Sequence, residues 1–385
     1  STYSHGLRTE LVKYNTKFST PFQSIKLVSN MNIQALLTPI TFPLSVLYAA
    51  VVKVRAWLFS CGVLRQHTYP MPIICVGNLS VGGTGKTPHV EYILRLLHQE
   101  GYRVAMLSRG YGRKTHGYIL ADAHRHTAAD IGDEPYQMMH NCPYATIAVC
   151  EKRTYGIERL MQLMPKIDVI VLDDAFQHRY VKAGLNVLLT DAHRLYTHDH
   201  LLPWGRLREP SVAAKRAQMV VITKCVNGER PSLPICLGQQ LYYSSIAYGP
   251  QQWLKPTNIP LPNYKAQRIM LVAGIANPMP LYHYLQQQGA EVELVKFRDH
   301  HTFNNNDIAQ LNAIWKQKHC TLAVTTQKDS TRLLSLLNQF EADLRQNFVV
   351  QPITVEITNS NPSKQSFNQI ILHYVRTNKR NCSVD

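Results

Sequence analysis

The sequence predicts an α/β protein: a doubly wound, mostly parallel sheet domain followed by a second, smaller α/β domain. Between residues 72 and 226, six short apolar runs alternate with stretches of helical character. This alternation is typical of parallel sheets covered by helices on both faces. A shorter series of the same kind begins after residue 265. An uncharged segment near the amino end adds a membrane-associated helix to the predicted fold.

The chain has 385 residues, which is enough for two domains that each bury a core of their own. Composition and periodicity divide it into five segments. They are residues 1–30, a non-native or flexible extension before Met31; 31–67, a membrane-associated helical segment; 68–226, the first α/β domain; 227–265, a connecting segment rich in Pro, Gly, Gln and Tyr; and 266–385, the second α/β domain.

The charge and the cysteines limit the class of function. The formal net charge of +16 predicts an anionic partner: nucleic acid, an acidic bilayer or a phosphorylated substrate. No helix-turn-helix, zinc-finger or RNP-type string is recognisable, so we do not expect nucleic acid, and no signal for a protein partner is evident. The eight cysteines are scattered without a C-x-x-C pair, which indicates reduced thiols and no zinc site.

The predicted membrane helix lies in residues 33–52, which contain no charged side chain. This is about the length of a membrane span. Pro39 and Pro43 interrupt it, and its continuation through Lys53 and Arg55 is amphipathic. An in-plane or shallow re-entrant helix therefore fits at least as well as a full span. A buried core helix is the structural alternative.

The strongest motif is "GNLSVGGTGKTPHV", residues 77–90, which follows a predicted strand and opens a predicted helix. That context is typical of a phosphate-binding loop (P-loop). Lys86 would reach the β- and γ-phosphates of ATP, and Thr87 would bind Mg²⁺. Ser80 stands where the strict pattern has glycine, and the adjacent glycine pair is expected to compensate. The residues predicted to bind the nucleotide are Gly82, Gly83, Thr84, Gly85, Lys86 and Thr87.

A second motif, "VIVLDDAFQHR", ends an apolar strand in two acids. In P-loop proteins an acid at this place helps to hold Mg²⁺. We therefore expect Asp173, with Asp174 beside it, to form the metal site together with Thr87. A strand that merely ends in polar residues is the alternative.

These motifs occur in register with several others: "LSRGYGR", "GDEP", "LLPWGRLREP", "FRDHHTF" and "TTQKDSTRL". Together they resemble the tetraacyldisaccharide 4'-kinase family, from Met31 to the carboxyl end. The resemblance implies an ATP- and Mg²⁺-dependent P-loop kinase of two α/β domains with an N-terminal membrane-associated helix. Its substrate would be a lipid-linked glucosamine disaccharide 1-phosphate, the lipid A precursor. It would act at the anionic cytoplasmic face of the bacterial inner membrane, as a peripheral or monotopic protein.

The resemblance also implies site residues. Asp133 in "GDEP" matches the family's proposed general base, and His300 in "RDHH" matches the histidine paired with it. A positioned carboxylate can accept the proton of a sugar hydroxyl, and an imidazole beside it can orient it. His301 is the alternative partner, and helix N-capping is the alternative role for Asp133.

Four further residues match family positions with less defined roles. Arg153 would sit near the phosphates, although a solvated helix position is the alternative. The others are expected to touch the substrate or metal-bound water, or to support the site: Gln177, His178 and Glu209. In "TTQKD" this chain has Gln327 where the family more often has Glu, which puts a charge-based role there in doubt.

Two rival classes remain. A membrane-associated P-loop switch ATPase would explain the loop and the apolar amino end, but not Asp133 and His300. A nucleic-acid-dependent ATPase rests on net charge alone. In the kinase interpretation, part of the basic surplus faces anionic lipid. The basic residues near the motifs are Arg109, Arg113, Lys114, Arg179, Lys182, Arg206 and Arg208.

Overall fold

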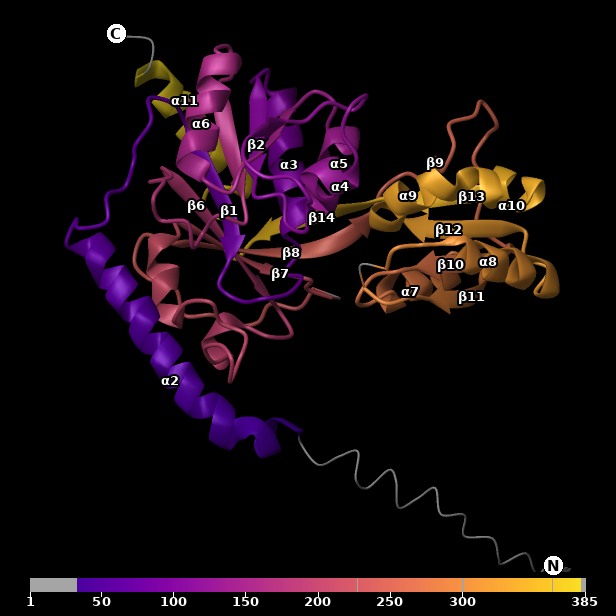
Figure 1. Cartoon of the computed structure of the whole chain (residues 1–385), viewed down its shortest axis with the longest axis horizontal. Helices are drawn as coiled ribbons and strands as arrows, with labels where there is room; N and C mark the ends of the chain where they lie inside the picture. The colour runs from indigo at the N-terminus through magenta and orange to yellow at the C-terminus, as the bar shows by residue number, and fades with distance from the viewer. Residues whose placement is uncertain (1–32, 227, 300, 362, 382–385) are drawn as a thin grey trace, which may run out of the picture.

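A computed structural model describes residues 33–381 with the exception of 227, 300 and 362, so the predicted extension 1–30 lies outside the described residues. The chain forms a larger and a smaller lobe, each built on one sheet, and a long helix that runs along the larger lobe (Figure 1). Both sheets are mostly parallel, which confirms the predicted fold class.

In the described part of the chain, nine strands form the large sheet in the order β14-β8-β7-β6-β1-β5-β2-β4-β3. Neighbours are parallel except at the two edges, where β14 and β3 pair antiparallel. The strands are β1 (Ile73–Asn78), β2 (Val104–Ser108), β3 (Ile119–Leu120), β4 (Thr146–Val149), β5 (Val169–Asp173), β6 (Leu185–Asp191), β7 (Met219–Thr223), β8 (Gln240–Tyr248) and β14 (Ile353–Asn359).

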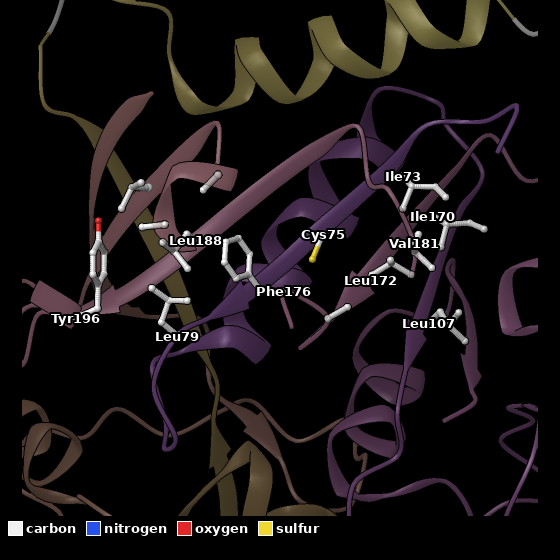
Figure 2. Close-up of a cluster of buried hydrophobic side chains, with 14 of the residues drawn as sticks. Ile73, Cys75, Leu79, Leu107, Ile170, Leu172, Phe176, Val181, Leu188 and Tyr196 are labelled. Atoms are coloured by element: carbon white, nitrogen blue, oxygen red, sulfur yellow. The ribbon is translucent and has the colours of Figure 1, made fainter. Parts of the chain in front are cut away.

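Helices cover both faces of this sheet because its central strands are apolar on both sides. Ile73 and Cys75 of β1 face one core cluster, and Ile74 and Val76 face the other. Figure 2 shows part of the first cluster, where Phe176 packs near Cys75. The helices of this lobe are α3 (Lys86–Gln99), α4 (Ala128–Ile131), α5 (Asp133–Asn141), α6 (Arg153–Leu163), η1 (Tyr196–His198), η2 (Ser211–Arg216) and α11 (Phe367–Asn381).

The small lobe is a five-stranded sheet in the order β11-β10-β12-β13-β9, counted over the residues that the structure describes. Its two faces carry separate core clusters, one beneath α7 and one beneath α8, α9 and α10. Its elements are β9 (Gln252–Trp253), β10 (Arg268–Ala273), α7 (Met279–Gln287), β11 (Glu291–Lys296), α8 (Asn305–Gln317), β12 (Leu322–Thr326), α9 (Gln327–Leu333), η3 (Leu334–Gln339), α10 (Ala342–Gln346) and β13 (Phe348–Gln351).

The lobes are joined by two adjacent chain segments, and this changes the predicted division of the chain. The predicted connecting segment 227–265 contains β8, a nine-residue strand of the large sheet. The predicted second domain 266–385 includes β14, which pairs with β8, and α11, whose Phe367, Ile371 and Val375 are buried in the large lobe. The small lobe thus lies between β8 and β14, where Gly249 N donates to Pro352 O at 3.0 Å.

The amino-terminal helix α2 (Ile33–Ser60) is continuous and contains Pro39 and Pro43. Its part from Thr38 to Ser60 is long and apolar enough to cross a membrane by length and composition, and most of it is exposed. The interpretation as a buried core helix is therefore wrong. One face of α2 nevertheless contacts the large lobe, through hydrogen bonds from Ser45 and Tyr48.

Candidate active site

The glycine-rich loop connects β1 to α3 at the carboxyl edge of the large sheet. Gly82 (φ 109°) and Gly85 (φ 80°) lie in the left-handed region that favours glycine. Ser80 does not, so the departure from the strict motif costs no backbone strain. The segment 206–208 braces the loop: Ser80 forms a bridge with Leu207, and Val81 N donates to Arg206 O at 2.8 Å.

Side chains from other elements hold three successive carbonyl oxygens of this loop. Lys224 Nζ contacts Gly83 O at 2.5 Å, and Thr223 Oγ1 donates to Thr84 O at 2.9 Å. His89 Nδ1 lies 2.7 Å from Gly85 O. Because these carbonyls are bound on the protein side, the amide groups at the start of α3 are left to face a ligand. Such N–H groups, with the helix dipole, favour an anion such as a phosphate.

Two acids end β5 beside this loop, in different environments. Asp173 is buried, with Ser108 Oγ 3.3 Å from its Oδ2. Burial, with the charges of Glu134 and Asp174, raises the pKa of Asp173 to about 7. Asp174 has φ 47° and lies between two cations. Its carboxylate is 3.7 Å from Lys86 Nζ and 3.1 Å from Arg208 Nη1.

This arrangement fits a magnesium ion that is bound mainly by nucleotide phosphates. Asp173 Oδ1 is buried and has no hydrogen-bond partner among the described residues, so one carboxylate oxygen is available at the strand end. The described residues contain no group of three or more His, Cys, Asp or Glu side chains placed to hold a metal. Mg²⁺ needs no such cage, because it commonly uses one or two carboxylates together with phosphates and water.

Arg153 lies at the first position of α6. The alternative interpretation, in which its side chain is exposed to solvent, is wrong. Only 3% of the residue is exposed. Its guanidinium donates to Cys150 O at 2.6 Å and to Asp173 O at 3.2 Å. Arg153 therefore fixes the backbone at the end of β5 and places a buried positive charge beside both acids.

The other three supporting residues hold the loop that follows β5. Gln177 Nε2 donates to Asn78 O at 2.7 Å, which links this loop to β1. His178 is partly buried, and burial together with nearby arginines lowers its pKa to about 4. Glu209 is buried in an ion pair with Arg216, which in turn donates to Phe176 O at 3.1 Å. In the structure Glu209 thus supports the loop through Arg216.

Asp133 is the first residue of α5 and makes an ion pair with Arg332 of α9, across the junction of the two lobes. The helix N-cap is Gly132, so the capping interpretation of Asp133 is wrong, although an acid in the first turn still suits the helix dipole. His300 lies outside the described residues. His301 Nε2 is 2.8 Å from Asp307, at the start of α8, which gives His301 a partner other than Asp133.

The structure thus brings the loop, Lys86, Asp173, Asp174 and Arg153 together at one sheet edge. Sequence reasoning missed several residues that shape this region, because their roles depend on contacts with distant segments or with the loop backbone. They are His89, Thr223, Lys224, Asp329 and Arg332. "TTQKDSTRL" was noticed only as part of a resemblance, and it contains the last two.

Two cavities, of about 440 and 340 Å³, lie away from this region. Both are lined by Arg103, Met164, Pro165 and Ile167, which precede or begin strands of the large sheet. They are therefore at the sheet edge opposite the glycine-rich loop and take no part in the candidate site.

A strand, a glycine-rich loop and a helix N-terminus, with acids at the end of the neighbouring parallel strand, define a P-loop nucleotide-binding protein of the phosphotransferase type. The sequence model of one family, described as tetraacyldisaccharide-1-P 4'-kinase, matches residues 37–375. The chain belongs to this family.

Individual relatives agree with this assignment. The chain is 45% identical to a tetraacyldisaccharide 4'-kinase of Bacteroides thetaiotaomicron, over 89% of this chain and 94% of the relative. It is 39% identical to the same-named protein of Flavobacterium johnsoniae, over 89% of this chain and 98% of the relative. Its fold is similar to the crystal structure of LpxK from Aquifex aeolicus in complex with ATP, with a TM-score of 0.70 and 26% identity over 89% of this chain and 99% of that chain.

Proposed function

We infer that this protein is an ATP-dependent kinase that phosphorylates the 4'-hydroxyl of a tetraacylated glucosamine disaccharide 1-phosphate. The product is the 1,4'-bisphosphate of this lipid A precursor. The observation that carries the inference is the family match over residues 37–375, which includes the glycine-rich loop and both lobes. The fold likeness to a structure in complex with ATP supports the choice of nucleotide.

We assign the phosphate-binding role to the amides of residues 82–87 and to Lys86. The bound carbonyls at Gly83, Thr84 and Gly85 support this assignment, since they orient the amide side of the loop toward a ligand. Thr87 and Asp173, with Asp174 nearby, would hold Mg²⁺, which neutralises phosphate charge when bound. Arg153 keeps the Asp173 backbone in place and adds positive potential where negative charge develops.

We assign the general base to Asp133. In the transfer step the 4'-oxygen forms a bond to the γ-phosphorus while the bond to the β,γ-bridging oxygen breaks. The hydroxyl proton passes to the carboxylate and ADP leaves. The Asp133 side chain is 34% exposed, so it is accessible to a substrate. His300 would orient this carboxylate, as the resemblance implies.

The assay is direct. Purified protein is incubated with ATP, Mg²⁺ and the tetraacylated disaccharide 1-phosphate, and the lipid is analysed by mass spectrometry. We expect a mass gain of one phosphoryl group. Asp133→Ala should lower turnover by about 10²-fold or more, because the proton acceptor is lost. Release of inorganic phosphate without phosphorylated lipid would instead identify a switch ATPase.

We further propose that α2 holds the enzyme on the cytoplasmic face of the inner membrane. The two faces of α2 support this. Phe42 packs edge-on against Trp204, and Tyr48 Oη donates to Arg208 O at 2.8 Å, so one face is fixed to the large lobe. The opposite face presents large apolar side chains to solvent, namely Ile40, Leu44, Leu47, Val51, Val54 and Trp57. An exposed apolar helix face of this kind suits the bilayer interface.

Basic residues would strengthen this attachment by about 1 kcal/mol each at an acidic surface. Arg113 is excluded because its side chain is 2% exposed and paired with Glu151, and Arg208 is paired with Asp174. The exposed members of the predicted set are Arg109, Lys114, Lys182 and Arg206.

Vesicle sedimentation tests the electrostatic part. Binding to anionic vesicles should weaken with added salt and should weaken further in Lys182→Glu. The control, Lys316→Glu, changes the charge of an exposed residue in the small lobe. Equal binding to neutral and anionic vesicles at low salt would contradict the proposal.

A further inference from the structure

The segment "TTQKDSTRL" forms the end of β12 and all of α9, and it builds a buried polar unit in the small lobe. Thr326 caps α9, since its Oγ1 accepts from Asp329 N at 3.1 Å. Asp329 is fully buried, and its Oδ2 accepts from Thr326 Oγ1 at 2.7 Å and from Gly274 N at 2.9 Å. Three donors of the small lobe thus hold the start of α9 and this carboxylate in one arrangement.

This unit places Arg332 one turn further along α9. Arg332 Nη1 is 3.6 Å from Asp329 Oδ1, and the Arg332 side chain is 10% exposed. Its Nη2 makes the ion pair with Asp133 in the other lobe. A mostly buried guanidinium, backed by a fully buried carboxylate, is therefore aimed at the carboxylate that we assign as the general base.

The two helices that carry this pair are tied at both ends. Arg332, near the end of α9, contacts Asp133 at the start of α5. Gln327, at the start of α9, donates through Nε2 to Asn141 Oδ1 at the end of α5, at 2.6 Å. The helices therefore lie antiparallel across the lobe junction. Gln327 stabilises the same contact without touching Asp133, which separates lobe docking from any effect on the base.

The charged surroundings of Asp133 come from four packed elements. Its own helix adds Glu134, Tyr136 and His140, and α9 contributes Lys328 and Asp329 in addition to Arg332. The remaining titratable groups on the elements packed against α5 are Asp130 on α4 and Lys86, His89, Glu91, Tyr92, Arg95 and His98 on α3. Arg332 makes an ion pair with Asp133, so its loss changes the electrostatics of the base directly.

We propose that Arg332 is a positioning residue for catalysis: it orients the Asp133 carboxylate from the opposite lobe and keeps it ionised, ready to accept the substrate proton. This rests on the proposed kinase function and on Asp133 as its base. A guanidinium binds a carboxylate with directional N–H donors, so it fixes the orientation of the acceptor as well as its charge. An adjacent cation also favours the ionised carboxylate.

The proposal predicts a change in pH dependence. A general base acts when it is ionised, so turnover rises with pH through the pKa of that base. Because Arg332 stabilises the anion, its removal raises the pKa of Asp133. The acidic limb of the kcat profile should then move toward higher pH by about one unit or more. A residue with a purely structural role would lower the amount of active enzyme at every pH alike.

The experiment compares Arg332→Gln, Arg332→Lys and Gln327→Ala with the wild type, using ATP, Mg²⁺ and the tetraacylated disaccharide 1-phosphate. Arg332→Gln should lower kcat by about 10- to 100-fold, with an unchanged KM for ATP and a shifted acidic limb. Arg332→Lys should restore the acidic limb and part of kcat, because it restores the charge without the planar donor pair. Gln327→Ala should leave the acidic limb in place.

Two further variants complete the test. Asp133→Ala combined with Arg332→Gln should be no slower than Asp133→Ala alone, because the two residues act as one unit. If circular dichroism shows that Arg332→Gln does not fold, Arg332→Met is measured in its place, since it keeps an apolar stem. A wild-type kcat and acidic limb in the folded neutral variant would overturn the inference while the kinase function stands. A wild-type enzyme that leaves the lipid unphosphorylated would overturn the function itself.

Discussion

The two lobes treat the helix that follows a strand in opposite ways. In the large lobe, β1 leads into α3 through a loop that ends in Gly85, and no side chain caps α3. In the small lobe, β12 leads into α9, where Thr326 caps the helix and Asp329 binds the adjacent backbone and hydroxyl groups. The same strand-to-helix connection is therefore open to an anion in one lobe and occupied by the protein's own carboxylate in the other.

This difference separates two tasks that lie on either side of the lobe junction. The open end in the large lobe leaves amide donors for phosphate, with Lys86 at the first helical position. The closed end in the small lobe, where Thr326 and Asp329 satisfy the start of α9, presents a cation, Arg332, to the other lobe. A fold can thus use one type of connection for binding and its counterpart for positioning.

The largest expected effect tests the open end, which is the uncapped start of α3 at Lys86. Lys86→Ala should lower the rate of phosphoryl transfer by roughly 10³-fold or more, because the β- and γ-phosphates lose a positioned cation. Lys316→Ala, an exposed position in α8, serves as control. Near wild-type turnover of Lys86→Ala in the lipid phosphorylation assay would remove the phosphate role from this loop.

The second prediction concerns the histidine that holds Gly85 O. His89 is buried, its Nε2 lies 2.8 Å from Ser244 Oγ, and burial lowers its pKa from 6.5 to about 4. As the pH falls, His89 therefore becomes protonated at a higher pH in the unfolded chain than in the folded protein. Stability from this residue is therefore complete above pH 6.5 and is lost between about pH 6.5 and 4, by about 3 kcal/mol.

Urea unfolding at several pH values checks this. His89→Gln should flatten the dependence over that window, whereas His124→Gln, at an exposed residue, should leave it as in the wild type. If both variants keep the wild-type slope, the open end does not depend on a neutral histidine.

The smallest expected effect tests the closed end, which is the start of α9 capped by Thr326. Thr326→Val removes the cap of α9 and one donor to Asp329, and should lower the free energy of unfolding by about 1–2 kcal/mol. The KM for ATP should stay unchanged, because the phosphate loop belongs to the other lobe. Isothermal titration with a nonhydrolysable ATP analogue provides the check. A marked loss of nucleotide affinity would show that the two ends are not separate in function.

The glycine-rich loop and the acids of β5 were predictable because each motif consists of consecutive residues. Loop, Lys86 and helix follow one another, and Asp173 directly ends an apolar run. The fold class followed from the same local alternation. These features need no knowledge of how distant segments meet.

Other features depend on long-range packing and were not predictable in this way. β14 completes the large sheet by pairing with β8, more than a hundred residues earlier, so local periodicity placed it in the wrong lobe. The ion pair of Asp133 with Arg332 joins two short helices, and nothing in either local sequence indicates that they contact each other. Arg153 was expected in solvent or near phosphate, because neither burial nor its bond to Asp173 O is visible in a helical pattern.

The position of the small lobe between β8 and β14 has a consequence for protein synthesis. The large lobe begins near residue 72 but receives β14 and α11 only from residues beyond 352, including Phe367, Ile371 and Val375 of its core. The small lobe is complete by β13, so it can fold on the ribosome while the large lobe still lacks an edge strand and a covering helix. Synthesis of β14 and α11, and not the emergence of the nucleotide loop, therefore sets the moment at which the binding lobe can close its core.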